Sequence, residues 1–270
     1  LIAERQAHAG QGAARNRGLT LAWGTYLAFA DGDDVVPPGA YAAMVGSLEA
    51  SGSDVCLGAI RRFDAERVWE PAWSREVHAQ PRRGVTLEEY LPAIKDILAC
   101  NRMMRRDFWD RVEAQFPVGL AYEDHWPMLH TLLRAKAIDV LDRPVYYWRA
   151  RPDGSSTGQQ KHLRQNLLDR LTVKRDAWDR LRSAPRAVQQ AWLGRVLDVD
   201  LPPFVSRAID ADEAYRADLR EAFARYVALA EPEAWAFVRG QNRVRAVLGA
   251  QGRWDDVRAY RRVDPGNAKL

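Results

Sequence analysis

The first 150 residues alternate between short apolar blocks and polar, glycine-containing breaks. Bulky residues over 26–30 predict a buried strand, which ends where Val35–Gly39 supplies prolines and a glycine. A helix is expected over 38–50 and a second strand over 54–60. A strand, a helix and a strand of these lengths form a βαβ unit. The pattern therefore predicts an α/β fold with a mostly parallel sheet flanked by helices.

Further elements are expected on either side of this unit. A glycine-rich segment over 8–22 has apolar positions close to helical spacing, and another helix is expected to begin near Glu123. The segments 97–101 and 145–149 have the apolar and aromatic composition of strands. The stretch 61–95 is rich in arginine, proline and tryptophan, which predicts a long irregular loop of the kind that is often functional.

Beyond residue 160 the pattern changes to amphipathic helices with few glycines. Helices are expected over 160–182, 185–198, 203–209, 211–230, 232–250 and 253–260. The sequence therefore predicts two parts, an α/β domain over 1–158 and an all-helical C-terminal region over 159–270.

Composition narrows the class of protein. The chain has 270 residues, of which 47% are hydrophobic and 28% charged, as in globular proteins. No apolar run approaches the roughly 18 residues of a membrane span. The net charge is +4, but 40 basic and 36 acidic residues are interleaved without a dense basic stripe, so nucleic acid is not an expected partner. Cys56 and Cys100 lack metal-ligand spacing and are expected to be reduced core residues of a cytoplasmic protein.

Candidate chemistry begins where the first predicted strand ends. Asp31-Gly32-Asp33-Asp34 places three carboxylates directly after a buried strand. Crowded carboxylates repel one another unless a cation neutralises them, and ligands of open α/β sheets bind at the carboxyl ends of strands. Asp and Gly are also ordinary turn residues. Two interpretations are therefore open at this point, a metal or phosphate site and a solvated acidic turn.

Four motifs together resemble the successive signatures of family 2 glycosyltransferases of the GT-A (Rossmann-like) fold. They occur in the order and spacing of that family, and the resemblance covers roughly residues 5–158. The motifs are Gly12–Gly18, Tyr26–Asp34, Tyr122–Asp124 and Pro144–Arg149. The family begins with a strand and a nucleotide-binding turn that have no counterpart here. The resemblance therefore implies an N-terminally incomplete domain that lacks two βα units, about sixty residues.

The resemblance implies a donor site with a metal ion. Asp31 and Asp33 match the Asp-x-Asp motif that holds Mn²⁺ or Mg²⁺ on the diphosphate of a nucleotide-sugar, with Asp33 as the more direct ligand. Oxygen ligands suit either ion. Arg15 matches an arginine that contacts the donor nucleotide or its phosphates.

The resemblance also implies a general base. Asp124 matches the carboxylate that takes the proton from the acceptor hydroxyl in a single displacement with inversion. By itself the pair Glu123-Asp124 would indicate the start of a helix, where the helix dipole stabilises negatively charged side chains. Acceptor or phosphate contacts are expected from four further residues: Glu123, His125, Arg149 and Ser156.

The expected function is that of an inverting, metal-assisted hexosyltransferase. The family resemblance implies a bacterial enzyme that transfers sugar to a hydroxyl of a surface polysaccharide, teichoic acid, glycan or polyol-phosphate. It also implies a cytoplasmic location, peripheral on the inner face of the membrane, and homo-oligomers formed through the C-terminal helices. The alternative is a catalytically impaired fragment that acts as an assembly or docking module.

Overall fold

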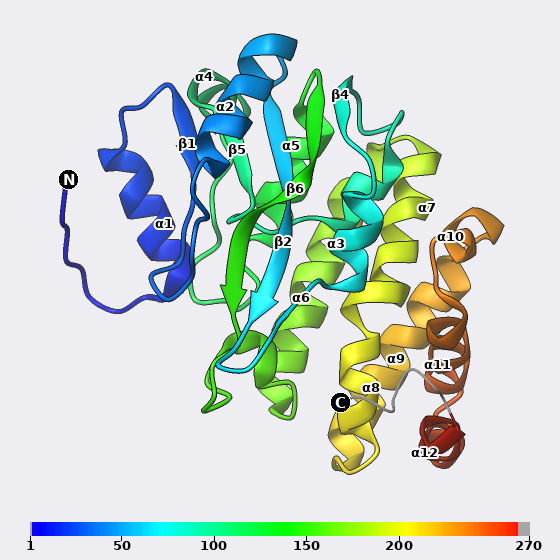
Figure 1. Cartoon of the computed structure of the whole chain (residues 1–270). Coiled ribbons are helices and arrows are strands. Elements are labelled where there is room, and N and C mark those ends of the chain that lie inside the picture. Colours follow the sequence, from blue (N-terminus) through cyan, green and yellow to red (C-terminus); the bar gives the residue numbers. More distant parts are fainter. Residues whose placement is uncertain (1, 264–270) are drawn as a thin grey trace. The chain divides into compact units, whose positions relative to one another are not determined.

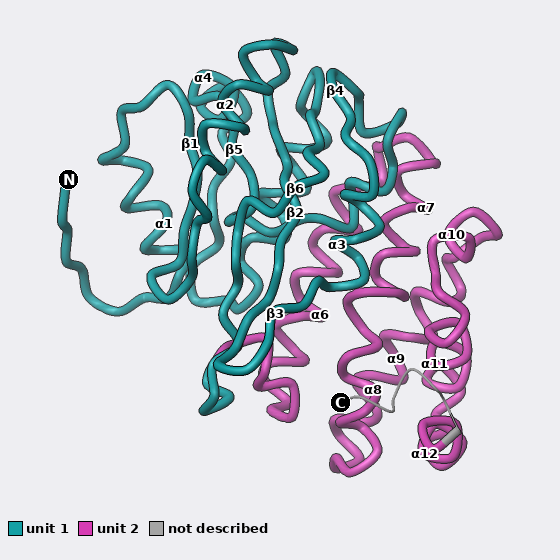
Figure 2. The backbone as a smooth tube through the Cα atoms, in the orientation of Figure 1, with its two compact units in different colours: residues 1–155 teal, residues 156–270 magenta. Residues whose placement is uncertain are grey.

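The computed structural model describes residues 2–263, and of Val263 only the backbone. The chain divides into two compact units, residues 1–155 and 156–270 (Figure 2). The sequence places the division between residues 158 and 159, and the compact units divide between Ser155 and Ser156. Among the described residues, none of the helices combines the length and apolar character needed to span a bilayer.

Unit 1 is built on one six-stranded sheet with helices packed against it (Figure 1). The strand order is β1-β5-β2-β6-β4, and β3 pairs with β2 outside this path. The strands are β1 (Tyr26–Ala28), β2 (Val55–Phe63), β3 (Val68–Trp69), β4 (Arg82–Val85), β5 (Arg102–Arg105) and β6 (Ile138–Arg149).

The sheet is mixed, which corrects the expectation of a mostly parallel one. Among the described strands only β2 and β6 pair in parallel, and the other pairs are antiparallel. The difference arises because β5 inserts between β1 and β2 and runs opposite to both. The strands β1, β2 and β6 therefore share one direction, and their carboxyl ends point to the same edge of the sheet.

The strand expected over 97–101 lies further along the chain. Residues 97–101 form an irregular segment and the strand is β5. The side chain of Asn101 donates to the carbonyl of Gly58 at 2.7 Å and to Asp96 at 2.6 Å. These bonds satisfy buried polar groups within an apolar loop. Residues 97–100 are apolar because they are buried in an irregular segment, and not because they form a strand.

The helices of unit 1 are mostly those expected, with shifted ends. They are α1 (Gly10–Leu21), α2 (Ala40–Ser51), α3 (Ala72–Val77), the 3₁₀ turn η1 (Leu91–Lys95), α4 (Arg106–Val112) and α5 (His125–Arg134). Together with β3 and β4, α3 and η1 occupy the stretch 61–95 that was expected to be irregular. The helix α2 starts at Ala40 because Gly39, with φ of 75°, takes a left-handed conformation that stops the helix from extending backwards.

The core of unit 1 lies where α2 covers the sheet. Met44 and Leu48 of α2, Cys56 and Ile60 of β2, and Tyr146 of β6 belong to one buried cluster. Burying such side chains supplies the main driving force for this packing. The ring of Tyr146 is therefore fixed by the core, and only its hydroxyl is left to make polar contacts.

The helix α1 is held closely against the segment before α5. A Cβ atom at Gly12 would lie 2.0 Å from the carbonyl oxygen of Pro117, so only glycine allows this approach. One turn further, the side-chain amide of Asn16 donates to the carbonyl of Phe116 (2.8 Å) and accepts from its N–H (3.0 Å). These contacts fix the position of Arg15 on α1.

Unit 2 is helical throughout the part that the structure describes. Its elements are η2 (Thr157–Gln159), α6 (Arg164–Arg180), η3 (Leu181–Ser183), α7 (Arg186–Arg195), the π-helical turn η4 (Val196–Asp200), α8 (Pro202–Ala208), α9 (Glu213–Leu229), α10 (Pro232–Ala236), α11 (Gly240–Ala250) and α12 (Trp254–Val263). The helix expected over 232–250 is broken into α10 and α11. Asp198 causes the break, because its carboxylate accepts from the backbone and side chain of Arg239.

Candidate active site

The acidic turn after β1 is tied to the end of β6. The amide of Val35 donates to the carbonyl of Tyr147 (3.0 Å), and the amide of Tyr147 donates back to Val35 (2.8 Å). The carboxylate of Asp34 accepts from the Tyr146 hydroxyl and from the Arg149 amide, each at 2.7 Å. Burial nevertheless raises the pKa of Asp34. The turn therefore stands at the common carboxyl edge of β1 and β6, as the sequence predicted for a ligand site.

Asp33 faces away from these anchoring contacts. Its carboxylate accepts from Nε of Arg151 at 2.7 Å, and its backbone carbonyl accepts from Nε of Arg149 at 2.6 Å. Its side chain is 35% exposed. The hydrogen bond from Arg151 is the main reason that the pKa of Asp33 is lowered. Asp33 is therefore an ionised and accessible carboxylate at the edge of the sheet.

Arg15 joins the acidic turn to the second acidic motif. One nitrogen of its guanidinium donates to Asp31 at 3.1 Å, and the other forms an ion pair with Glu123. The guanidinium also lies over the ring of Phe116, 5.4 Å from its centroid. Burial alone would lower the pKa of Arg15. The negative charges of Asp124, Asp31 and Glu123 outweigh that effect and raise the pKa. The arginine was predicted to contact the donor, and here its guanidinium bridges two acids.

Glu123 and Asp124 lie at the start of α5. Glu123 is only 6% exposed, and burial together with the charge of Asp124 raises its pKa to about 7. Asp124 occupies the position just before the helix, where its carbonyl accepts from the Met128 amide. The preceding Tyr122 has φ of 65°, a conformation that an aromatic residue rarely takes and that costs energy. A strained turn therefore presents both acids.

His125 is buried, as is Glu123, whereas Arg149 is partly exposed. His125 is 4% exposed, and its ring packs against Tyr122 with centroids 5.6 Å apart. This placement favours a packing role over contact with a substrate. Ser156 is the first residue of unit 2, where its carbonyl accepts from the Gln159 amide. The remaining predicted residues, Arg15, Asp31, Asp33, Glu123, Asp124 and Arg149, belong to unit 1.

Cys100, which the sequence indicated only as a reduced core residue, is affected by the charges of this site. Burial raises the pKa of its thiol well above the usual value, and the charges of Asp31, Asp124 and Asp34 raise it further. The charges of both acidic motifs therefore act on one thiol. Tyr146 and Arg151 were missed. The aromatic motif that ends β6 was the available signal for Tyr146.

The carboxylates of the acidic turn suit a hard divalent cation that also binds the oxygens of a diphosphate. Among residues 2–263, no three His, Cys, Asp or Glu side chains gather into a ready-made metal cage. Mg²⁺ sites on phosphates need only one or two carboxylates, because the phosphate and water oxygens supply the other ligands. The exposed, ionised Asp33 meets this requirement, with Asp31 at the other side of Gly32.

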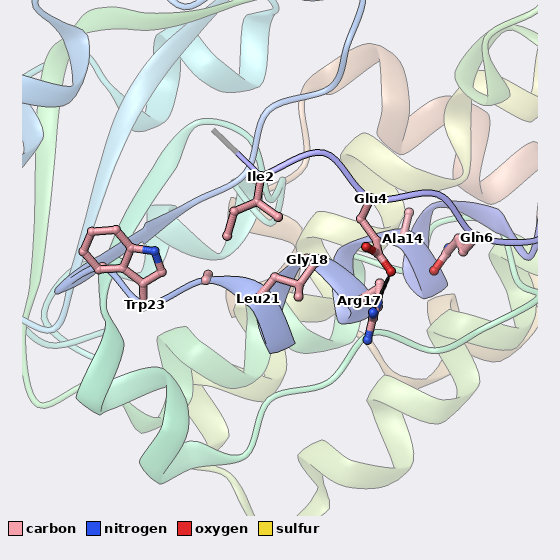
Figure 3. A pocket seen from close by; sticks show the side chains of 10 residues that line it. Ile2, Glu4, Gln6, Ala14, Arg17, Gly18, Leu21 and Trp23 are labelled. Carbon is pink, nitrogen blue, oxygen red and sulfur yellow. Dashed lines mark hydrogen bonds and ion pairs between the residues drawn. The ribbon is translucent and has the colours of Figure 1, made fainter.

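A separate hollow lies along α1. It has a volume of about 550 Å³ and none of the predicted site residues lines it. Figure 3 shows Ile2 and Glu4 of the N-terminal segment facing Arg17 and Leu21 of α1 across it. Glu4 and Arg17, which both line the hollow, form an ion pair (2.6 Å).

The fold of unit 1 and its acidic edge define a glycosyltransferase-type α/β domain. Residues 1–112 match the family model described as "Glycosyl transferase family 2". The matched residues make up less than half of the chain.

One curated relative is also described as a glycosyltransferase. The "Uncharacterized glycosyltransferase EpsJ" of Bacillus subtilis is 24% identical over 157 residues, which cover 55% of this chain and 44% of that protein. The chain thus spans less than half the length of this curated relative.

Solved structures of TarS from S. aureus share the fold. The structure of residues 1–349 with UDP-GlcNAc has a TM-score of 0.63 at 18% identity, covering 93% of this chain and 71% of that chain. The corresponding complex with UDP has a TM-score of 0.60 at 18% identity and covers 93% and 70%. The coverage of 93% leaves out only a small part of this chain, and the likeness shows that the fold is shared.

Proposed function

We propose that the chain transfers a sugar from a nucleotide-sugar donor to a hydroxyl of a surface polysaccharide, teichoic acid or related acceptor, with inversion at the anomeric carbon. The observation that carries the proposal is the bridge made by Arg15. It joins Asp31, at the carboxyl end of β1, to Glu123, beside Asp124 at the start of α5. The bridge connects the predicted donor end of the site to its predicted catalytic end.

The donor is held at the acidic turn in this proposal. Asp33, with Asp31, would hold Mg²⁺ or Mn²⁺, which when bound neutralises the charge that develops on the leaving diphosphate. Arg149 and Arg151 already lie against Asp33. Arg151 donates to the carboxylate and Arg149 to the backbone carbonyl, so a cation bound at the carboxylate would release the guanidinium of Arg151 to bind phosphate oxygens. A UDP-sugar is the first donor to test, because the TarS structures of the same fold hold UDP-GlcNAc and UDP.

Asp124 acts as the general base. Its carboxylate removes the proton of the acceptor hydroxyl while that oxygen attacks the anomeric carbon from the face opposite the diphosphate. Arg15 and the buried Glu123 hold the start of α5 in place and set the local charge. Glu123, with a pKa near 7, limits the negative charge around Asp124 below neutral pH.

The proposal is tested by Mn²⁺-dependent transfer from a panel of nucleotide-sugars. Asp33→Ala and Asp124→Asn should each reduce the rate by roughly a hundredfold or more, since each removes a group that acts on the transition state. Asp64→Asn is the matched control, because Asp64 is also an acid near the carboxyl end of a strand, β2, but pairs only locally with Arg67. Lack of any metal-dependent donor binding by the wild-type protein would refute the proposal.

A further inference from the structure

Tyr146 contacts the acidic turn but has no part in the proposed chemistry. Its ring lies in the core cluster of unit 1 and its side chain is completely buried. Its hydroxyl accepts a hydrogen bond from the backbone amide of Asp31 at 2.9 Å and donates its own proton to Oδ2 of Asp34 at 2.7 Å. One hydroxyl thus connects the first and last residues of the turn.

Asp34 completes this arrangement from the other side. Its second carboxylate oxygen, Oδ1, accepts from the backbone amide of Arg149 at 2.7 Å. Both oxygens of Asp34 are therefore bound to β6. Although it lies in the same acidic motif, Asp34 is turned towards the sheet, whereas Asp33 beside it is exposed and faces Arg151.

The turn needs such an anchor because of the residue at its centre. Gly32 is exposed, and a side chain added there would have nothing within 4 Å. One backbone hydrogen bond, from the Asp34 amide to the Asp31 carbonyl (3.2 Å), closes the turn over this glycine, whose backbone is intrinsically free to adopt many conformations. A site that is not held in one conformation must lose that freedom when it binds a ligand, which weakens binding.

We propose that Tyr146 and Asp34 form a clamp that fixes the carboxylates of Asp31 and Asp33 in the orientation that binds a cation and a nucleoside diphosphate. Tyr146 is then a positioning residue and Asp34 is an anchor, not a metal ligand. The inference rests on the proposed function, since it deepens the description of the same site.

The binding test compares Tyr146→Phe with Tyr147→Phe in the full chain. Tyr147→Phe removes the same hydroxyl from the neighbouring residue, whose ring packs edge-on against Phe63. Mn²⁺ binding in the presence of UDP is followed by the electron paramagnetic resonance signal of free Mn²⁺. Tyr146→Phe should weaken binding roughly tenfold, because it removes one hydrogen bond to a charged group and one to a backbone amide. Tyr147→Phe should change it less than about twofold.

A second measurement needs no ligand. Hydrogen exchange at the Asp31 amide, followed by NMR, should be faster in Tyr146→Phe than in the wild type and unchanged in Tyr147→Phe. If the Asp31 amide exchanges equally fast in all three proteins, the clamp does not exist. This comparison remains decisive even if the wild type binds no Mn²⁺ with UDP, a result that would refute the proposed function.

A double-mutant cycle separates the clamp from a general loss of stability. Asp34→Asn alone should weaken Mn²⁺ binding with UDP as Tyr146→Phe does, and the double variant should bind no more weakly than either single variant. Two residues that act through one contact give this non-additive result. If the two effects add in full, or if Asp34→Asn abolishes Mn²⁺ binding by itself as a direct ligand would, the inference is wrong.

Discussion

Asp33 and Asp34 are neighbours in the chain and face different partners. Asp34 is bound through both oxygens to β6, while the carboxylate of Asp33 accepts from the exposed side chain of Arg151. The hydrogen bond from Arg151 lowers the pKa of Asp33, and burial raises that of Asp34. Residues of identical chemistry therefore differ in the direction of their pKa shift and in exposure, because one side of the turn is covered by the sheet.

Glu123 gives a prediction at the residue scale. Its pKa of about 7 in the folded chain lies above its value in an unfolded chain, so the folded state binds the proton more tightly. The bound proton adds to the free energy of unfolding. This contribution is fully present at low pH and is lost as the pH rises from about 4.5 to about 7. Glu123→Gln removes that dependence. The thermal midpoint of the variant should therefore rise relative to the wild type between pH 5 and pH 8, by an amount equivalent to at most about 3 kcal/mol.

Thermal unfolding at several pH values checks this expectation. Glu88→Gln, at an exposed position, controls for the loss of a surface charge. The raised pKa of Glu123 would be contradicted if the thermal midpoints of Glu123→Gln and the wild type differed by the same amount at every pH from 5 to 8.

At the scale of elements, the close contact of α1 decides where Arg15 lies. Gly12→Ala would place a methyl group 2.0 Å from the carbonyl oxygen of Pro117, so α1 has to move. We expect a loss of about 1–3 kcal/mol in stability and reduced transfer, since Arg15 moves with the helix. Gly18→Ala in the same helix has nothing within 4 Å and should stabilise the chain by up to about 1 kcal/mol. Thermal unfolding and transfer assays of both variants test this contrast, which would be wrong if the two behaved alike.

Unit 2 has a buried charge cluster that the helical periodicity did not indicate. Asp200, at the end of the π-helical turn η4, pairs with Arg170 (2.9 Å), Lys174 (2.6 Å) and Arg195. Burial lowers the pKa of Lys174 well below its usual value, and the three cations lower the pKa of Asp200. The carboxylate is therefore required to compensate several buried positive charges.

Removing that carboxylate should destabilise unit 2 strongly. Asp200→Asn leaves the cations without their counter-charge, for which we expect a loss of about 3–5 kcal/mol. Asp176→Asn removes an exposed i,i+4 pair with Arg180 and should change stability by less than about 1 kcal/mol. Chemical denaturation followed by circular dichroism distinguishes the two. Equal effects would mean that the buried cluster does not stabilise the unit.

At the scale of the whole molecule, each unit has its own core. Trp192 of unit 2 stacks on Trp178 and lies edge-on to Tyr226, all within residues 156–270. Because these contacts are internal, residues 156–270 expressed alone should fold cooperatively into helices. Circular dichroism and thermal unfolding of this piece test the expectation. A non-cooperative melt would show that residues 156–270 do not fold independently of residues 1–155.

The sequence indicated much of this architecture because local signals were strong. Glycines marked the ends of α2, and helical spacing placed α6, α7 and α9 within a few residues. The direction of β5 had no local signal, because strand pairing depends on distant partners. The break between α10 and α11 was also missed, since it is fixed by Asp198, some forty residues earlier in the chain.

By itself, the sequence determined the family resemblance, the helical character of the C-terminal part and the residue types of the site. These depend on composition and spacing along the chain. Only the tertiary structure decided that Asp34 binds Tyr146, that Arg15 bridges two acidic motifs and that His125 is buried. Hydrogen bonding, burial and the resulting pKa values depend on which distant segments meet, and packing of the whole chain brings those segments together.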